Sequence, residues 1–128
     1  RAADYYTGYQ PNHRAAEFMT ITYDATDRCK QEAPAVVHID GTARPQVVDE
    51  MTNPCFHALL TEYERLTGLP QVINTSFNMH EEPIVRTAEE AVQAFEASKL
   101  DVLVLGNYIL ESAVLSLTTE PVTTIEQK

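Results

Sequence analysis

The alternation of apolar and polar residues predicts strands in the first half of the chain. After a short helix or turn over residues 2–9, residues 17–23 (EFMTITY) alternate and are rich in β-branched and aromatic side chains, which favours a strand. Two more strands are expected at residues 35–40 and 44–48. A turn at Gly41-Thr42 joins them, and the Asp-Gly pair at its start is a frequent hairpin signal. The pattern therefore predicts a hairpin centred on Gly41.

Two longer helices are expected from their start and stop signals. At Asn53 a capping side chain precedes a proline in the first helical position, and Gly68 is a stop signal. The second helix opens at Thr87, three residues before Glu90, which is the spacing of a capping box. The apolar residues at helical spacing are Phe56, Leu59, Leu60 and Tyr63 in the first helix and Ala88, Ala91, Val92 and Phe95 in the second.

The last third of the chain predicts a further pair of strands. Residues 101–105, DVLVL, form a nearly continuous apolar run, which is typical of a central strand. A turn at Gly106-Asn107 leads to a last strand that starts at Tyr108. Strands and helices that alternate without a strict βαβ rhythm predict an α+β fold, in which helices pack on a mixed, twisted sheet.

The size of the chain, 128 residues, allows one domain with a sizeable core. We expect this domain at residues 1–117, with its core at 14–112 and a flexible, Thr- and Glu-rich tail at 118–128. No apolar run is long enough to cross a bilayer and no signal peptide is recognised, so we expect a cytoplasmic protein without membrane contact. Two cysteines are too few for a disulfide framework. Because the first residue is Arg1 rather than Met, we expect a piece of a larger protein.

The chain is strongly acidic. It has 19 acidic and 9 basic residues and a net charge of −10, so a surface that binds nucleic acid is not expected. The same charge opposes the binding of anionic ligands, and only a local cation can reverse it. Arg44 is the best-placed candidate for that cation. Most of the acidic residues are expected only to solvate the surface.

The polar stretch NTSFN, at residues 74–78, directly follows an apolar pair. If this segment is extended, Asn74, Ser76 and Asn78 lie on one face. Two carboxamides and a hydroxyl provide donors and acceptors without fixed charge, which suits an oxyanion or a polar small molecule beside a cation. The alternative is a strand end that breaks into an Asn/Ser turn.

A second polar motif, HIDGTARPQ, spans residues 38–46 and contains Arg44. Pro45 biases the preceding backbone toward an extended conformation, so Arg44 and Gln46 are expected on one side. A guanidinium presents a planar fork of donors that matches phosphate or carboxylate. The alternative is an exposed arginine that pairs with one of the many acids.

Other chemical groups are weaker candidates. Cys55 and His57 lack the spacing of a metal pair and the four histidines are scattered, so no metal site is expected. His38 is expected to be a hydrogen-bonded structural residue, with general base catalysis as the alternative. His80 and the two glutamates after it are expected to be solvated loop residues. No glycine-rich phosphate loop or Ser-His-Asp triad is recognised.

The two polar motifs occur together in a known family. HIDGTARPQ, NTSFN and the later EEPIVRTAEEAVQAFEASKLDVLVLGNYIL resemble the C-terminal, YrdC-like domain of the NodU/CmcH-type O-carbamoyltransferases. The resemblance extends from about Ala33 to Leu110, and two separated motifs in the same order make it specific. It implies a YrdC-like fold, here as a fragment of a larger domain, and a role in nodulation or antibiotic biosynthesis.

The resemblance also implies an activity and its residues. In this family carbamoyl phosphate and ATP, with Mg²⁺, form a carbamoyl-adenylate, and the carbamoyl group then passes to an acceptor hydroxyl. Residues that match Arg44, Asn74 and Ser76 are expected to hold carbamoyl phosphate or its adenylate. Arg44 and Ser76 are the expected catalytic residues, and Asn78 extends the binding pattern. The expected partner is an N-terminal actin-like domain, which carries the acceptor site and a metal.

The chain departs from the family in two respects. It lacks the Lys- and Arg-bearing segment before this domain and the acceptor domain, and Arg86 stands where relatives more often have a small or uncharged residue. Activity is therefore expected in the full-length protein and not in this fragment. Two alternatives stay open: an inert binding or interaction module, and another YrdC-like enzyme that forms an acyl-adenylate.

Overall fold

The computed structural model describes residues 1–112, which fall into two compact units. The first unit runs from Arg1 to Asn74, and the second begins at Thr75. The flexible tail predicted at residues 118–128 lies outside the described residues.

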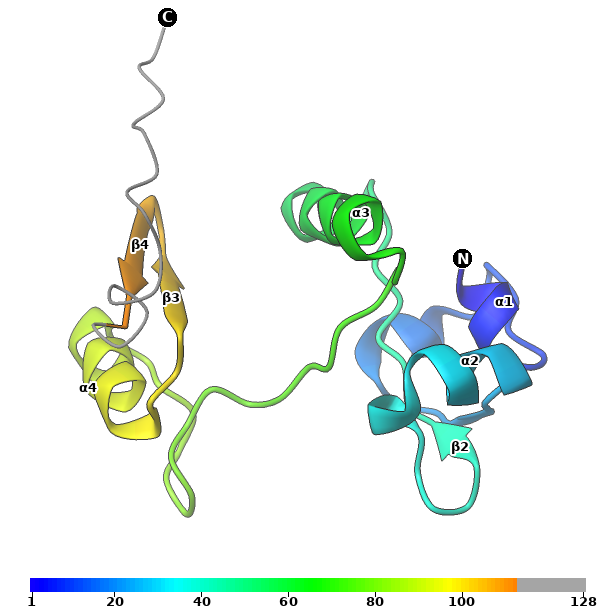
Figure 1. Cartoon of the computed structure of the whole chain (residues 1–128), viewed down its shortest axis with the longest axis horizontal. Coiled ribbons are helices and arrows are strands. Elements are labelled where there is room, and N and C mark those ends of the chain that lie inside the picture. Colours follow the sequence, from blue (N-terminus) through cyan, green and yellow to red (C-terminus); the bar gives the residue numbers. More distant parts are fainter. Residues whose placement is uncertain (113–128) are drawn as a thin grey trace, which may run out of the picture. The chain divides into compact units, whose positions relative to one another are not determined.

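The first unit contains three α-helices, two short 3₁₀ helices and one pair of short strands (Figure 1). In chain order these elements are α1 (Ala2–Tyr5), η1 (Arg14–Phe18), β1 (Tyr23–Asp24), α2 (Asp27–Glu32), η2 (Pro34–Val36), β2 (Thr42–Ala43) and α3 (Pro54–Thr67). β1 and β2 pair antiparallel, with Tyr23 opposite Ala43.

The core of the first unit is built around tyrosines and small residues. Tyr5 and Cys29 are almost completely buried, and Tyr6 and Tyr23 are also buried. The ring centroids of Tyr6 and Tyr23 are 6.4 Å apart, within the range of favourable aromatic contacts. Burial of these rings ties α1 and α2 to the small sheet and so supports the segment that follows β2.

The hairpin predicted from residues 35–40 and 44–48 is not formed. The turn itself is present, because Gly41 has a φ of 83° and its N–H donates to the carbonyl oxygen of His38. However, β2 pairs with β1, and Pro34 begins the 3₁₀ helix η2 where the first strand was expected. A proline has no N–H for a strand ladder and suits the first position of a helix, which explains the difference.

The strand predicted at residues 17–23 is wrong except at its end. η1 takes its first two residues, and Met19 then adopts a left-handed backbone conformation with a φ of 56°. A left-handed residue reverses the chain direction and interrupts the alternation of side chains. Only Tyr23 remains in a strand, β1.

The two predicted helices are confirmed. α3 begins after Asn53, whose side chain caps it, and ends at Gly68, which has a φ of 78°. α4 (Ala88–Ser98) begins after Thr87, whose side chain accepts a hydrogen bond from the N–H of Glu90. Among the described helices, none combines the length and the apolar surface that a membrane span requires.

The second unit consists of α4 and a hairpin (Figure 1). β3 (Val102–Leu105) and β4 (Tyr108–Glu111) pair antiparallel around the predicted Gly106 turn. Ala91 and Phe95 of α4 pack on Leu103 of β3 to form its core. β3 was predicted to be a central strand, but within residues 1–112 it pairs only with β4, and the apolar side chain of Val104 is 65% exposed.

These elements give the chain an α+β fold, as predicted. In place of one mixed sheet, the described residues form two antiparallel pairs of strands, one in each unit. A mixed sheet would need a strand that joins β1 and β2 to β3 and β4, and the described residues contain none.

Candidate functional site

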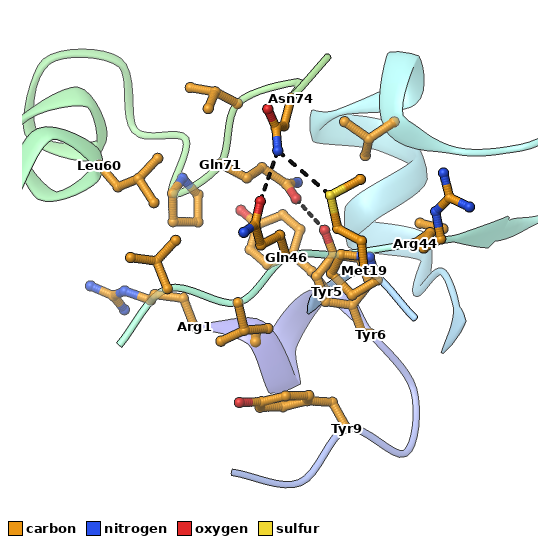
Figure 2. Close-up of a pocket in the computed structure, with 18 of the residues that line it drawn as sticks. Arg1, Tyr5, Tyr6, Tyr9, Met19, Arg44, Gln46, Leu60, Gln71 and Asn74 are labelled. Carbon is orange, nitrogen blue, oxygen red and sulfur yellow. Dashed lines mark hydrogen bonds between the residues drawn. The ribbon is translucent and has the colours of Figure 1, made fainter. Parts of the chain in front are cut away.

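The first unit contains a cavity of about 540 Å³ that Arg44 and Asn74 help to line (Figure 2). Tyr5, Tyr6 and Tyr9 contribute aromatic surface to it, and α3 contributes apolar surface. A volume of this size is typical of sites for small organic ligands. The cavity is therefore the candidate site of the first unit.

The cavity lining carries an excess of positive charge although the chain as a whole is acidic. Apart from two histidines, its ionisable acidic and basic groups are Arg1, Arg44 and Glu64, besides tyrosines. Glu64 Oε1 lies 2.8 Å from Arg1 Nε, so these two charges neutralise each other. No acidic group of the cavity lining then remains to balance the charge of Arg44. The resulting local positive potential can attract an anion.

Arg44 has neither a hydrogen bond nor an ion pair within residues 1–112. Each of the other arginines of the chain forms an ion pair with a carboxylate. Arg44 lies between two buried residues, Ala43 and Pro45, which hold its backbone in place. The pairing with an acid that the sequence left open is thus not observed in the described part of the chain. All the donors of this guanidinium remain available to a ligand.

Asn74 is held by two side chains that come from distant parts of the first unit (Figure 2). Its Nδ2 atom donates a hydrogen bond to Gln46 Oε1 at 2.7 Å and lies 3.5 Å from Met19 Sδ. Arg44 and Gln46 both line the cavity, although residues 44–48 do not form the strand on which these two side chains were expected to share a side. Sequence reasoning assigned no role to Met19, and no local signal in the chain marks it.

A second polar contact lies at the border between the cavity and the core. The hydroxyl of Tyr6 donates to Gln71 Oε1 at 2.6 Å (Figure 2). Gln71 Nε2 is buried without an ordinary hydrogen bond, and its neighbour is the thiol of Cys29, a weak acceptor. Sequence reasoning missed this group as well, because it joins residues that are far apart in the chain.

Burial keeps these core groups uncharged. It raises the pKa of Tyr6 to about 12, with smaller contributions from Cys29 and Tyr5. Burial also raises the pKa of the Cys29 thiol, and the Gln71 amide opposes this change only in part. At neutral pH both groups are therefore protonated, and neither adds negative charge beside an anion site.

Ser76 and Asn78 lie in the second unit, at a smaller cavity of about 230 Å³. Asn78 Nδ2 donates to the carbonyl oxygens of Met79 and Glu82, both at 2.9 Å, so this side chain holds the loop that follows it. The hydroxyl of Ser76 is exposed and makes no hydrogen bond within residues 1–112. Ser76 thus has a free donor, whereas Asn78 has only its oxygen free.

The NTSFN segment is not a strand in the structure. Residues 74–78 have no strand partner in the described part of the chain, so Asn74, Ser76 and Asn78 do not share the face of a sheet. Arg44 and Asn74 line the cavity of the first unit, and Ser76 and Asn78 line that of the second.

The turn before Arg44 is fixed by its own polar side chains. Asp40 Oδ1 accepts hydrogen bonds from the N–H and the hydroxyl of Thr42, at 3.0 and 2.8 Å. These two bonds lower the pKa of Asp40. His38 Nδ1 lies 3.0 Å from Thr42 Oγ1, as expected for a structural histidine. Within residues 1–112, no three His, Cys, Asp or Glu side chains are grouped so that they could hold a metal ion.

Comparison with known families shows to which family the chain belongs. A model of the carbamoyltransferase C-terminus matches residues 1–112. The chain belongs to this family of carbamoyltransferase C-terminal domains. The resemblance inferred from the HIDGTARPQ and NTSFN motifs is therefore confirmed.

The chain is also similar to individual proteins of archaea and of nodulating bacteria. The chain is 36% identical over 107 residues to an uncharacterized protein of Methanocaldococcus jannaschii, a match that covers 84% of this chain and 21% of the relative. It is 40% identical over 104 residues to the nodulation protein NolO of Bradyrhizobium diazoefficiens, covering 81% of this chain and 19% of the relative. It is 41% identical over 63 residues to nodulation protein U of Rhizobium tropici, covering 49% and 11%. The chain thus spans about a fifth or less of the length of these relatives.

Proposed function

We propose that this chain is the C-terminal part of an O-carbamoyltransferase and that the cavity beside Arg44 receives carbamoyl phosphate and ATP. Family membership supports a carbamoyltransferase domain. The observation that carries the proposal is that Arg44, unlike the other arginines, has no carboxylate partner among residues 1–112 and lines a cavity with excess positive charge. An acidic chain needs such a group to bind anionic substrates.

In the proposed reaction, water first breaks the bond between oxygen and phosphorus in carbamoyl phosphate and releases phosphate. The carbamate oxygen then bonds to the α-phosphorus of ATP, and pyrophosphate leaves. The acceptor hydroxyl next attacks the carbamoyl carbon, loses its proton and releases AMP. The acceptor site and its metal would lie in an N-terminal domain, in a part of a longer protein outside this chain.

The residues of the chain would act by binding and orientation. The guanidinium of Arg44 would bind phosphate oxygens in a fork and reduce the repulsion between the anions. The role of Ser76 is proposed from the family resemblance: its hydroxyl, at the separate cavity of the second unit, would donate to a substrate oxygen on which charge develops. The cavity has one carboxylate, Glu64, and Arg1 pairs with it. Mg²⁺ would therefore be held by the phosphates of ATP, and we assign it no ligand in this chain.

The test is carbamoyl-phosphate-dependent ATP turnover in the full-length enzyme, measured for Arg44→Ala. Loss of a key anion donor is expected to remove about 2–4 kcal/mol of transition-state stabilisation. This corresponds to a decrease in kcat/KM of roughly 30- to 1,000-fold. Arg14→Ala is the matched control, because Arg14 is also exposed in the first unit but pairs with Glu17 and does not line the cavity.

The possible results separate the candidate functions. Turnover unchanged in Arg44→Ala would refute the role of this arginine. A wild-type enzyme that neither binds carbamoyl phosphate nor turns over ATP in its presence would favour an inert module. Turnover that depends on a different acyl donor would favour another enzyme that forms acyl-adenylates.

A further inference from the structure

The side-chain amide of Asn74 is held in one orientation by the protein. Its nitrogen faces Gln46 Oε1 at 2.7 Å and Met19 Sδ at 3.5 Å, and its oxygen is turned away from both (Figure 2). Gln46 lies two residues after Arg44, so the fixed segment that carries the guanidinium also carries the group that orients this amide.

Met19 favours the orientation in which the amide nitrogen of Asn74, and not its oxygen, faces Gln46. Between two carboxamides alone, either one can donate, because each has an N–H₂ group and a carbonyl oxygen. A thioether sulfur can only accept a hydrogen bond, so it favours the nitrogen of Asn74 over the oxygen. Met19 also has a left-handed backbone, with a φ of 56°, a conformation that is uncommon for a residue other than glycine.

The orientation of the amide determines which atom of Asn74 is available to a ligand. Both of its N–H groups are directed at protein acceptors, and Oδ1 has no partner among residues 1–112. The family resemblance led us to expect that Asn74 helps to hold carbamoyl phosphate, and a donor would suit its carbonyl and phosphate oxygens. The structure leaves an acceptor instead, and an acceptor repels phosphate and carbonyl oxygens but binds an N–H group.

We propose that Asn74 Oδ1 accepts a hydrogen bond from the amino group of carbamoyl phosphate, and that Gln46 and Met19 are positioning residues for this contact. The amino group is the donor that distinguishes carbamoyl phosphate from acetyl phosphate, in which a methyl group takes its place. The Asn74 site therefore selects carbamoyl over other acyl phosphates. This inference rests on the proposed function, because it assigns a specificity to the same cavity.

Two stable phosphonates test this selection in the full-length enzyme. Phosphonoacetamide and acetonylphosphonate differ only in having an amino or a methyl group on the carbonyl carbon. Isothermal titration should show that the wild-type enzyme binds phosphonoacetamide roughly tenfold more tightly, the effect of one hydrogen bond whose loss leaves an acceptor unpaired. The ratio of the two Kd values is the readout, because a purely structural role of Asn74 would change both Kd values alike.

Two single variants, their double variant and a control variant separate the orientation of Asn74 from general anion binding. Gln46→Leu removes the acceptor of the Asn74 amide at similar size, and Met19→Leu removes the sulfur. Each is expected to lower the Kd ratio by several-fold, and the double variant is expected to bring it within about twofold of one. Gln46→Glu is the matched control, because its carboxylate still accepts from Asn74 Nδ2. It should keep the Kd ratio while weakening the binding of both anions.

The results distinguish failure of this inference from failure of the proposed function. If neither phosphonate nor carbamoyl phosphate binds to the wild-type enzyme, the proposed function is wrong. If carbamoyl phosphate binds and supports turnover but both phosphonates bind equally, the selection by Asn74 is wrong and the function stands. A Kd ratio that stays at its wild-type value in both Gln46→Leu and Met19→Leu would also overturn the positioning role. Gln46 and Asn74 are exposed, so these variants are expected to fold, and circular dichroism checks this.

Discussion

At the scale of single residues, polar side chains with the same sequence signal have different hydrogen-bonding capacity left for a ligand. Asn74 and Asn78 both use their amide nitrogens within the protein, the first on Gln46 and the second on backbone carbonyl oxygens. Ser76, between them, has a hydroxyl that no group of residues 1–112 binds. Within this segment and the described residues, Ser76 is therefore the side chain with a donor that no protein group uses.

Replacement of Ser76 by alanine is expected to weaken carbamoyl phosphate binding and to leave the fold intact. The hydroxyl makes no protein hydrogen bond in the described residues, so its loss leaves no protein group unpaired. A hydrogen bond to a charged ligand contributes about 1.5–3 kcal/mol, so the Kd measured by titration should rise roughly 10- to 100-fold. Ser98→Ala is the control, because Ser98 lines the same cavity but donates to the carbonyl oxygen of Phe95. If Ser76→Ala unfolds the second unit, Ser76 is a structural residue.

At the scale of elements, the contacts at the start of α4 make the stability of the second unit depend on pH. Glu90 accepts hydrogen bonds from the backbone N–H of Arg86 at 2.8 Å and from its Nη2 atom at 3.2 Å. These contacts, the backbone bond first, lower the pKa of Glu90 from its usual 4.5. A pKa that is lower in the folded than in the unfolded state stabilises the fold above the unfolded value. This stabilisation is lost as the pH falls through the folded value.

Glu90→Gln is expected to remove that pH dependence. The protection of α4 amides from hydrogen exchange should be greater in the wild type than in the variant at neutral pH. The difference should shrink once the pH falls below the usual value of 4.5. Glu89→Gln is the control, because Glu89 is exposed in the same helical turn and forms no ion pair in the described residues. Equal effects of the two variants at every pH would contradict the role assigned to Glu90.

At the scale of the whole molecule, α3 presents apolar residues that the described chain does not cover. None of its residues is buried, and Leu59 and Leu66 are 53% and 67% exposed. A stripe of this kind on a stable helix is typical of a surface that another part of a protein covers. The chain spans about a fifth of its long relatives, so a longer protein has enough additional residues to cover it.

We expect α3 to be buried in the full-length enzyme. Leu66→Ser should lower the free energy of unfolding of the full-length protein by about 1.5–3 kcal/mol, the value for full burial of a leucine, and should change that of the 128-residue chain little. Urea denaturation of both proteins measures the two effects. Ile39→Ser is the control, because Ile39 is fully exposed in the turn before β2. Small effects of Leu66→Ser in both proteins would show that α3 faces solvent.

The sequence alone determined the features that depend on neighbours a few residues away. The caps at Asn53 and Thr87, the stop at Gly68 and the turn at Gly106 mark α3, α4 and the β3–β4 hairpin, because capping and turn formation involve adjacent backbone groups. The two polar motifs were likewise enough to identify the family, because their residues and their order along the chain are read directly from the sequence.

Only the tertiary structure decided which groups are left for a ligand. The Asn74 amide is oriented by Gln46, 28 residues away, and by Met19, 55 residues away. The pairing of β2 with β1 also depends on contacts between distant segments, and so does the finding that no carboxylate in the described part of the chain pairs with Arg44. Such contacts form when the chain packs its core, and no local pattern of residue types determines which acceptor a given N–H group finds.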